Sequence, residues 1–454
     1  MKIFFVSLGC DKNLVDSEKM LGLLNESGYE ITDEENDADA VIVNTCCFIH
    51  DAKKESIETL LEYAELKNKG LIRYLVAAGC LAQRYKDEIL KEIPETDVVL
   101  GPAACSEIVN ILRSLETSRD ISSVKRQYTE ESGYKEIINT RLKSGLGHYS
   151  YLKIAEGCDK RCTYCIIPYI RGSYRSFPKE QLLSEAQQLV LNGVNELILV
   201  AQETSLYGTD IYGYKAIGEL IDGLCAIEGL EWIRLMYCYP EEIGDQLIDA
   251  FKRQPKLCRY IDLPIQHISD NILKRMGRHT NGEQIREIIG ILRKEVPGIV
   301  IRTSLITGFP GETEEEHKEL LEFVRSAALE RVGVFTYSRE ENTPAARMKD
   351  QVPASVKKRR RKELMLAQQD IVFKKNQSLT GKSFKVMIDG RLSDEDSLKG
   401  IKSRYVYIAR TYMDAPDIDG SVFVESDREI MSGTMTDVTI TGYNGYDLIG
   451  YETK

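Results

Sequence analysis

The stretch 156-EGCDKRCTYCIIP-168 places three cysteines, Cys158, Cys162 and Cys165, within eight residues. A structural zinc site needs four tetrahedral ligands, and a 4Fe–4S cubane has an iron for each of four thiolates. No fourth cysteine or suitably spaced histidine lies near this segment. The C-x3-C-x2-C spacing therefore favours an iron–sulfur cluster with one open iron, where a substrate or cofactor binds, over an incomplete zinc knuckle.

The cysteine segment comes at the end of the first of six apolar stretches that alternate with amphipathic helical patterns such as 179–191 and 313–328. Six βα repeats predict a partial (βα)6 TIM-like barrel, in which the chemistry lies at the carboxyl ends of the strands. The predicted strands are 149–158, 195–202, 232–238, 259–266, 300–310 and 331–338.

The first hundred residues predict a separate, doubly wound parallel sheet with helices on both faces, because near-continuous apolar strands alternate with helical patterns. Its predicted strands are 2–8, 38–46 and 73–80. Cys10 follows the first of them, and Cys46 and Cys80 are the last residues of the other two. The carboxyl ends of parallel strands share one edge of the sheet, where ligands bind in such folds. We therefore expect these three cysteines to converge.

The C-terminal part predicts a small antiparallel β-barrel, from short strands at 383–390, 404–410, 421–426 and 436–452 with turn residues between them. A charged helix at 353–377 precedes it. The basic run 357–362 in this helix is interpreted as a solvated face.

These patterns predict an α/β protein in four parts. They are an N-terminal domain at 1–115, a polar and weakly periodic linker at 116–143, a barrel core at 144–374 and a C-terminal domain at 377–454.

Composition narrows the class of protein. The chain has eleven cysteines, an odd number, so reduced thiols are expected rather than a set of disulfides. Its apolar N-terminus ends in a polar segment without a cleavage-like site, so a cytoplasmic location is expected. No apolar run is long enough to span a membrane. With 60 Lys and Arg against 71 Asp and Glu, the net charge of −11 disfavours general binding to phosphate backbones.

The C-x3-C-x2-C segment resembles the defining motif of the radical S-adenosylmethionine (SAM) enzymes. The resemblance implies that Cys158, Cys162 and Cys165 hold a 4Fe–4S cluster whose open iron binds SAM. It also implies that an electron from the cluster cleaves SAM to a 5′-deoxyadenosyl radical. A cofactor is chemically necessary here, because no side chain alone breaks an unactivated C–H bond.

Further segments, "SLGCDKNLVDSE", "VIVNTCCF", "VAAGC" and "IRTSLITGFPGETEEE", resemble the methylthiotransferases over essentially the whole chain, including a TRAM-like C-terminal barrel. By that resemblance Cys10, Cys46 and Cys80 hold a second 4Fe–4S cluster, which handles the sulfur. Cys47 departs from the family, which usually has glycine there, so Cys47 competes with Cys46 as a ligand. The other cysteines, Cys105, Cys225, Cys238 and Cys258, are interpreted as core or incidental residues.

Methylthiotransferases modify either an adenosine of transfer RNA or an aspartate of ribosomal protein S12 (uS12). "SLGCDKNLVDSE" and "AQETSLYGTD" are more similar to the ribosomal-protein group. Residues 377–454 carry nine Lys and Arg against thirteen Asp and Glu, a net of −4, which suits a basic ribosomal protein better than RNA.

The resemblance implies further cofactor contacts at Gln202 and Glu203, which end the second barrel strand, and at Arg302. "GFPGE", residues 308–312, is either a cofactor border or a turn before a helix. "RGSYRSFP" departs from the family's usual ending, so the roles of Arg171 and Arg175 stay open.

The interpretation favoured by these observations is a transferase that adds a methylthio group to the β-carbon of an aspartate of uS12, with two 4Fe–4S clusters and SAM as methyl donor and radical source. The implied partners are uS12, free or within the small ribosomal subunit, and an electron donor such as flavodoxin or ferredoxin. Direct transfer RNA binding is disfavoured. The alternatives are the same chemistry on transfer RNA adenosine, or a non-enzymatic ribosome-associated iron–sulfur protein.

Overall fold

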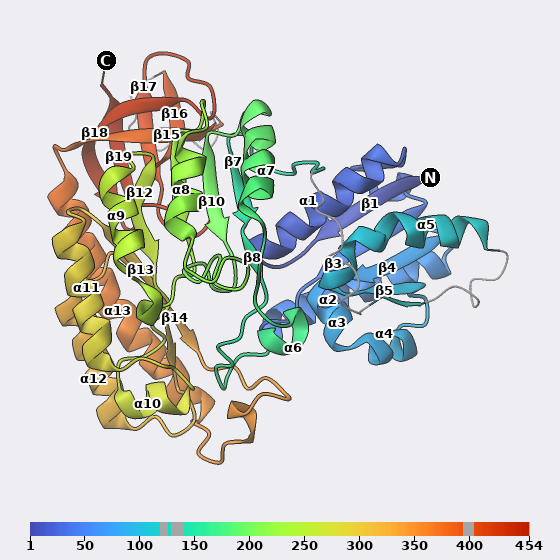
Figure 1. The fold of residues 1–454 in the computed structure, drawn as a ribbon, viewed down its shortest axis with the longest axis horizontal. Helices are drawn as coiled ribbons and strands as arrows, with labels where there is room; N and C mark the ends of the chain where they lie inside the picture. The colour runs from blue at the N-terminus through green and yellow to red at the C-terminus, as the bar shows by residue number, and fades with distance from the viewer. Residues whose placement is uncertain (119–125, 129–139, 394–403, 454) are drawn as a thin grey trace.

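The computed structural model describes residues 1–118, 126–128, 140–393 and 404–453, which form an N-terminal sheet domain, a central barrel domain and a C-terminal β-barrel (Figure 1). This is the predicted α/β architecture. None of the described helices combines the length and apolar character needed to cross a bilayer.

The N-terminal domain is a six-stranded parallel sheet of order β2-β1-β3-β4-β5-β6. Its sixth strand, β6, falls within the range predicted as a linker and pairs with β5. The strands are β1 (Lys2–Ser7), β2 (Glu30–Thr32), β3 (Ala40–Thr45), β4 (Tyr74–Ala78), β5 (Val98–Leu100) and β6 (Gln127–Tyr128).

Helices cover both faces of this sheet because its strands are apolar on both sides. In β3, Val41 and Val43 lie on the face of the sheet that α2 covers, whereas Ala40 and Ile42 lie on the face that α1 and α5 cover. Such continuous burial is typical of a doubly wound parallel sheet. The helices are α1 (Asp11–Glu26), α2 (His50–Asn68), α3 (Gly79–Arg84), α4 (Lys86–Glu92) and α5 (Ile108–Thr117).

The central domain is an open six-stranded parallel sheet of order β14-β13-β12-β11-β10-β7, which confirms a partial barrel. The strands are β7 (Tyr149–Lys153), β10 (Glu196–Val200), β11 (Trp232–Leu235), β12 (Leu257–Asp262), β13 (Val300–Thr307) and β14 (Arg331–Thr336), and a short hairpin, β8 (Ala155–Glu156) with β9 (Arg175–Ser176), flanks the cysteine segment.

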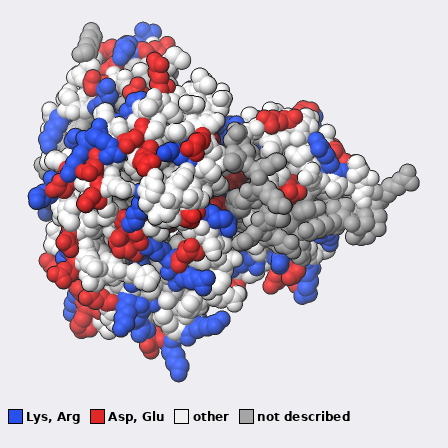
Figure 2. Space-filling model, viewed as in Figure 1, with Lys and Arg blue, Asp and Glu red and all other residues white. Residues whose placement is uncertain are grey.

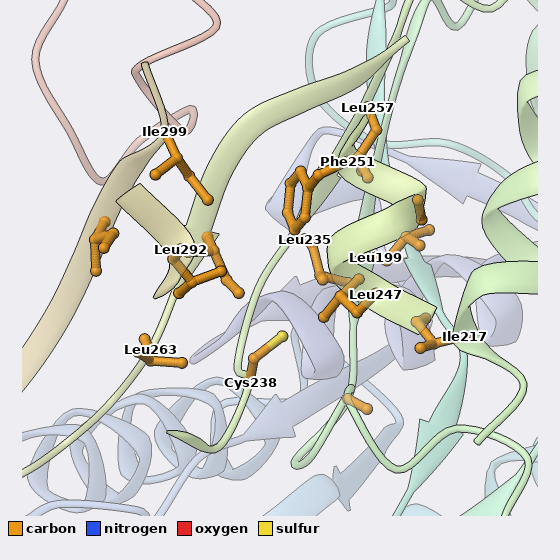
Figure 3. Close-up of a cluster of buried hydrophobic side chains, with 14 of the residues drawn as sticks. Leu199, Ile217, Leu235, Cys238, Leu247, Phe251, Leu257, Leu263, Leu292 and Ile299 are labelled. Carbon is orange, nitrogen blue, oxygen red and sulfur yellow. The ribbon is translucent and has the colours of Figure 1, made fainter. Parts of the chain in front are cut away.

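Apolar side chains fill the space between this sheet and its outer helices (Figure 3). Cys238 lies in this layer among Leu235 and Leu247 and is fully buried, as expected of a core cysteine. The helices are α6 (Ile167–Arg171), α7 (Lys179–Leu191), α8 (Ile217–Cys225), α9 (Asp245–Arg253), α10 (Asp270–Arg275), α11 (Gly282–Glu295), α12 (Glu314–Ala327) and α13 (Ala354–Leu379).

The interpretation of the basic run in α13 as a solvated face is wrong in part. Arg360 is buried and donates to the Glu312 carbonyl at 3.0 Å, and Lys357 donates to the Tyr337 carbonyl at 2.8 Å. These cations satisfy backbone carbonyls because α13 packs along β14 and α12.

The C-terminal domain is a closed five-stranded barrel of order β15-β16-β17-β19-β18. It contacts the amino ends of the barrel strands: His148, which precedes β7, bonds Asp389 at 2.7 Å, and Asn195, which precedes β10, donates to the Gly433 carbonyl at 2.9 Å. This domain therefore lies at the end of the barrel opposite to the carboxyl ends of its strands. The strands are β15 (Ser383–Arg391), β16 (Tyr405–Thr411), β17 (Val422–Ser426), β18 (Met435–Asn444) and β19 (Asp447–Glu452).

Candidate active site: two cysteine trios

The first candidate site is the N-terminal trio, defined as Cys10, Cys46 and Cys80. Each cysteine follows one of β1, β3 and β4, which are consecutive neighbours in the sheet. Gly9 has a φ of +97°, and a Cβ at this position would lie 3.0 Å from the Cys46 sulfur. Because β1, β3 and β4 are adjacent parallel strands, their three carboxyl ends lie at one edge of the sheet, as predicted.

Burial and neighbouring charges set the electrostatics of the N-terminal trio. Burial raises the pKa of the Cys46 thiol, whereas the backbone N–H of Phe48 opposes this shift. Burial also raises the pKa of Cys80 well above its ordinary value, and Arg171 opposes it. A cation and backbone N–H groups near buried thiols are the features that stabilise bound thiolates.

The second candidate site is the loop trio, defined as Cys158, Cys162 and Cys165. It follows β7 and β8 at the carboxyl end of the barrel sheet, and Cys158 and Cys162 are buried. Gly157 has a φ of +79°, and a Cβ there would lie 2.1 Å from the Ser173 carbonyl oxygen. Only glycine fits this close approach of two chain segments.

Burial and nearby backbone N–H groups set the electrostatics of the loop trio. Burial raises the pKa of Cys158 to about 11 and that of Cys165 to about 12. The backbone N–H groups of Lys160 and Ile167 oppose these two pKa shifts. In each case the donor is two residues after the cysteine, as it is for Cys46 and Phe48.

The donor sets fit a cluster better than a single metal ion. In the part of the chain that the structure describes, no three His, Cys, Asp or Glu side chains are placed to hold one ion. Thiolates that bind three corners of a cubane contact three different irons, so they need not approach one another as ligands of a single zinc do. Two sets of three thiols therefore fit two clusters, each with one open iron.

A buried polar network joins the two trios, and sequence patterns did not predict it. Arg171 donates to Asp16 and Glu156, both at 2.9 Å, and Lys153 donates to Glu156 at 2.6 Å. Although burial opposes its charge, Arg171 and Lys153 hold the pKa of Glu156 well below its usual range. Gln202 donates to the other oxygen of Glu156 at 2.9 Å.

A cavity of about 390 Å³ opens beside the loop trio. Glu203, predicted as a cofactor contact, is fully buried, and burial raises its pKa to about 7. The cavity contains both acidic and basic groups, as a site for a zwitterionic cofactor would. Its lining residues are Cys158, Asp159, Lys160, Tyr174, Glu203, Leu206, Thr209, Asp210 and His279.

The other predicted contacts lie apart from this cavity. Arg302 is the third residue of β13 and pairs with Asp262 at 2.7 Å and with Asp419 of the C-terminal domain at 3.7 Å. "GFPGE" forms a turn in which the Glu312 carboxylate accepts from the N–H groups of Gly308 and Phe309. A direct role of either in cofactor binding stays a prediction.

Three family models match the chain: an uncharacterized family, UPF0004, over residues 2–101, the radical SAM superfamily over 152–324 and the TRAM domain over 380–451. The chain is therefore a radical SAM protein with an N-terminal UPF0004 domain and a C-terminal TRAM domain. Membership of the radical SAM superfamily implies a 4Fe–4S cluster and SAM.

Curated relatives match over nearly their full length. The ribosomal protein uS12 methylthiotransferase RimO of Lachnoclostridium phytofermentans is 56% identical over 99% of both chains, and that of Acetivibrio thermocellus is 49% identical over 99% of this chain and 98% of the relative. The chain belongs to the RimO family of uS12 methylthiotransferases.

Solved structures share the fold at low identity. The radical SAM methyltransferase TsrM of Kitasatospora setae, with cobalamin and a [4Fe–4S] cluster bound, has a TM-score of 0.56 at 16% identity over 76% of each chain. The cobalamin-dependent enzyme OxsB has a TM-score of 0.51 at 14% identity, covering 82% of this chain and 56% of that one.

Proposed function

We propose that this protein is an enzyme that adds a methylthio group to the β-carbon of an aspartate of ribosomal protein uS12. The observation that carries the proposal is the presence of two separate thiol trios at strand ends of one chain, in a member of the RimO family. One trio suits radical generation, and the second suits handling of the sulfur. A structural or redox-sensing role alone would not require the cavity beside the loop trio.

Each trio has an assigned role in this proposal. Cys158, Cys162 and Cys165 would hold the cluster that, with SAM, supplies a radical able to attack an unactivated C–H bond. Cys10, Cys46 and Cys80 would hold a second 4Fe–4S cluster for the sulfur. SAM would serve both as methyl donor and as radical source.

The protein's own residues bind the cofactor and exclude water. The buried Glu203 carboxylate would hold the amino group of SAM, because it lines the cavity. Lys160, which pairs with Glu242, lines the same cavity and would contribute positive charge near the carboxylate of SAM. Gln202 does not line this cavity, and it would act indirectly, because its side chain donates a hydrogen bond to Glu156. Burial of Cys158 and Cys162 keeps water away from the loop trio.

Surface charge supports a protein substrate over transfer RNA. Basic and acidic side chains are interspersed on the face shown in Figure 2 rather than gathered into one continuous basic surface. The TRAM domain is acidic overall, at nine Lys and Arg against thirteen Asp and Glu. Phosphate neutralisation supplies most nucleic-acid affinity, so this surface suits a basic ribosomal protein better. The substrate would be uS12 alone or within the small subunit, with flavodoxin or ferredoxin as electron donor.

The test is an anaerobic reaction of the cluster-loaded protein with SAM, dithionite, sulfide as the source of sulfur, and either uS12 or transfer RNA. We expect uS12 to gain one methylthio group in place of one hydrogen, which mass spectrometry detects, and 5′-deoxyadenosine to form. A methylthio group on transfer RNA alone would replace the proposed substrate. Absence of 5′-deoxyadenosine from protein with full iron content would favour a non-enzymatic role.

A further inference from the structure

Arg171 contacts the surroundings of both cysteine trios. It is the last residue of α6, which follows the loop trio in the sequence, and its side chain is 2% exposed. From the N-terminal domain, Asn13 accepts a hydrogen bond from Nη2 at 2.9 Å, and the Cys80 sulfur lies 3.4 Å from the same nitrogen. From the barrel, Glu156 accepts from Nη1.

This arrangement fixes the guanidinium in one orientation. Asp16 of α1 and Glu156 of β8 both accept from Nη1 at 2.9 Å, while Nη2 faces Asn13 and Cys80. The planar guanidinium holds its N–H groups in a rigid fork. Hydrogen bonds to α1 of the N-terminal domain and to β8 of the barrel therefore fix both its position and its orientation.

The charges in this region balance. Two cations, Arg171 and Lys153, face two buried carboxylates, Asp16 and Glu156. Arginine stays protonated in proteins, so a permanent positive charge lies beside the Cys80 sulfur in a region shielded from water. Hydrogen bonds to cluster sulfurs and nearby charge are among the factors that set the reduction potential of an iron–sulfur cluster.

We propose that Arg171 is a positioning residue that aligns the N-terminal trio with the loop trio and donates a hydrogen bond to the sulfur of Cys80. This inference rests on the proposed function, because it requires a cluster at the N-terminal trio. Its two consequences are a higher reduction potential at the N-terminal site and efficient coupling of SAM cleavage to methylthio transfer.

The first test measures a potential rather than activity. In a background where Cys158, Cys162 and Cys165 are replaced by alanine, only the N-terminal cluster remains, and its midpoint potential is read by anaerobic titration. Arg171→Met removes charge and donor, so the potential should fall. Arg171→Lys keeps the charge but not the fork, so an intermediate potential is expected.

The second test uses the intact trios. Methylthio product per 5′-deoxyadenosine should fall about 10- to 100-fold in Arg171→Met, because small misplacements of reacting groups cost rates of this order. Cleavage of SAM should continue, since the loop trio keeps its three cysteines. Arg171→Lys should restore part of the coupling.

Arg84 provides the matched control. Its side chain is also buried, and it bridges the same two domains by bonding Glu340 at 3.2 Å and the Glu341 carbonyl at 2.9 Å. Among the described residues, Arg84 forms no hydrogen bond or ion pair with Cys10, Cys46 or Cys80, although it donates to the Cys47 carbonyl at 3.3 Å. Arg84→Met should lower thermal stability without changing the potential or the coupling ratio.

Two results would overturn the inference. One is an unchanged potential and ratio in Arg171→Met or, where that variant does not fold, in Arg171→Lys. The other is an equal change in Arg84→Met, which would reduce Arg171 to general domain docking. Wild-type protein that loads both clusters but leaves uS12 unmodified would refute the proposed function instead, while the potentials would still test Arg171.

Discussion

The two cysteine trios reach similar donor sets by different routes. The loop trio lies on one short segment, whose shape depends on local backbone features such as Gly157 and the positive φ of Arg161 at 50°. The N-terminal trio comes from three segments that only the pairing of β1, β3 and β4 brings together. The loop trio therefore depends on local geometry, and the N-terminal trio depends on the folding of a whole domain.

The surroundings of the two trios differ as well. One face of α1, directly after Cys10, is polar yet buried: Asp16, Glu18 and Lys19 are all less than a tenth exposed. Lys19 pairs with Glu185 at 3.0 Å and Asp16 pairs with Lys153, so this face docks the N-terminal domain on the barrel. Glu18 pairs with Arg141 of the segment that precedes the barrel. The N-terminal trio is thus tied to the barrel through charges, whereas the loop trio belongs to the barrel itself.

Removing a ligand from each trio should have the largest effect. Cys162→Ala should abolish 5′-deoxyadenosine formation and leave the absorption spectrum of the N-terminal cluster in place. Cys46→Ala should spare SAM cleavage and stop methylthio addition. Full product formation by Cys46→Ala would mean that Cys47 or another thiol serves as the ligand.

Alanine at the glycines beside each trio should separate local from sheet-dependent geometry. At Gly157 the new Cβ would lie 2.1 Å from the Ser173 oxygen, and at Gly79 it would lie 2.3 Å from the Asn44 side-chain oxygen. Gly157→Ala should lose iron from the loop trio alone, and Gly79→Ala from the N-terminal trio alone, as measured by iron content and electron paramagnetic resonance.

Gly213 is the control for these two variants, because it has a φ of +80° but no neighbour within 4 Å. Gly213→Ala should cost about 1–2 kcal/mol from its left-handed backbone and keep both clusters. Equal iron loss in all three variants would show that general instability, not crowding at the trios, is responsible.

Glu203→Gln should weaken SAM binding and leave iron content unchanged. Loss of a charged hydrogen-bond acceptor in a buried cavity costs about 1.5–3 kcal/mol, which is roughly a 10- to 150-fold increase in Kd. Equilibrium dialysis with labelled SAM checks this. An unchanged Kd would exclude Glu203 as a contact of the cofactor.

The smallest effect on either trio is expected from Glu196, which lies at the interface between barrel and TRAM domain and pairs with Arg234 at 2.8 Å and Arg410 at 2.7 Å. Burial opposes its charge, but Arg410 and Arg234 lower its pKa below the ordinary 4.5. Its stabilising contribution is therefore present above pH 4.5 and is lost as the pH falls through the lower pKa of the folded state.

Glu196→Gln should therefore lower the free energy of unfolding at pH 7, by about 3–5 kcal/mol, and should flatten the loss of stability below pH 4.5. Urea unfolding at several pH values provides the measurement. Iron content per folded chain should match wild type; a selective loss at one trio would show that the interface supports that site.

Much of this organisation is readable from sequence, for physical reasons. The C-x3-C-x2-C spacing is local, so it can be recognised directly. Cys10, Cys46 and Cys80 each follow an apolar strand, which predicts that they lie at the same edge of a parallel sheet. The docking face of α1 could not be predicted, because charged residues at helical spacing are typical of solvated faces and the partners of Lys19 and Asp16 lie more than 130 residues away. The two-residue strand β6 is too short for periodicity to reveal.

The most direct test of two trios with two clusters is iron, acid-labile sulfide and zinc analysis of anaerobically prepared protein and of two triple-alanine variants, one for each trio. Wild type should contain about eight irons and eight sulfides per chain, and each variant about four. Zinc at either trio, or an iron content that stays the same when Cys10, Cys46 and Cys80 are replaced, would contradict the account.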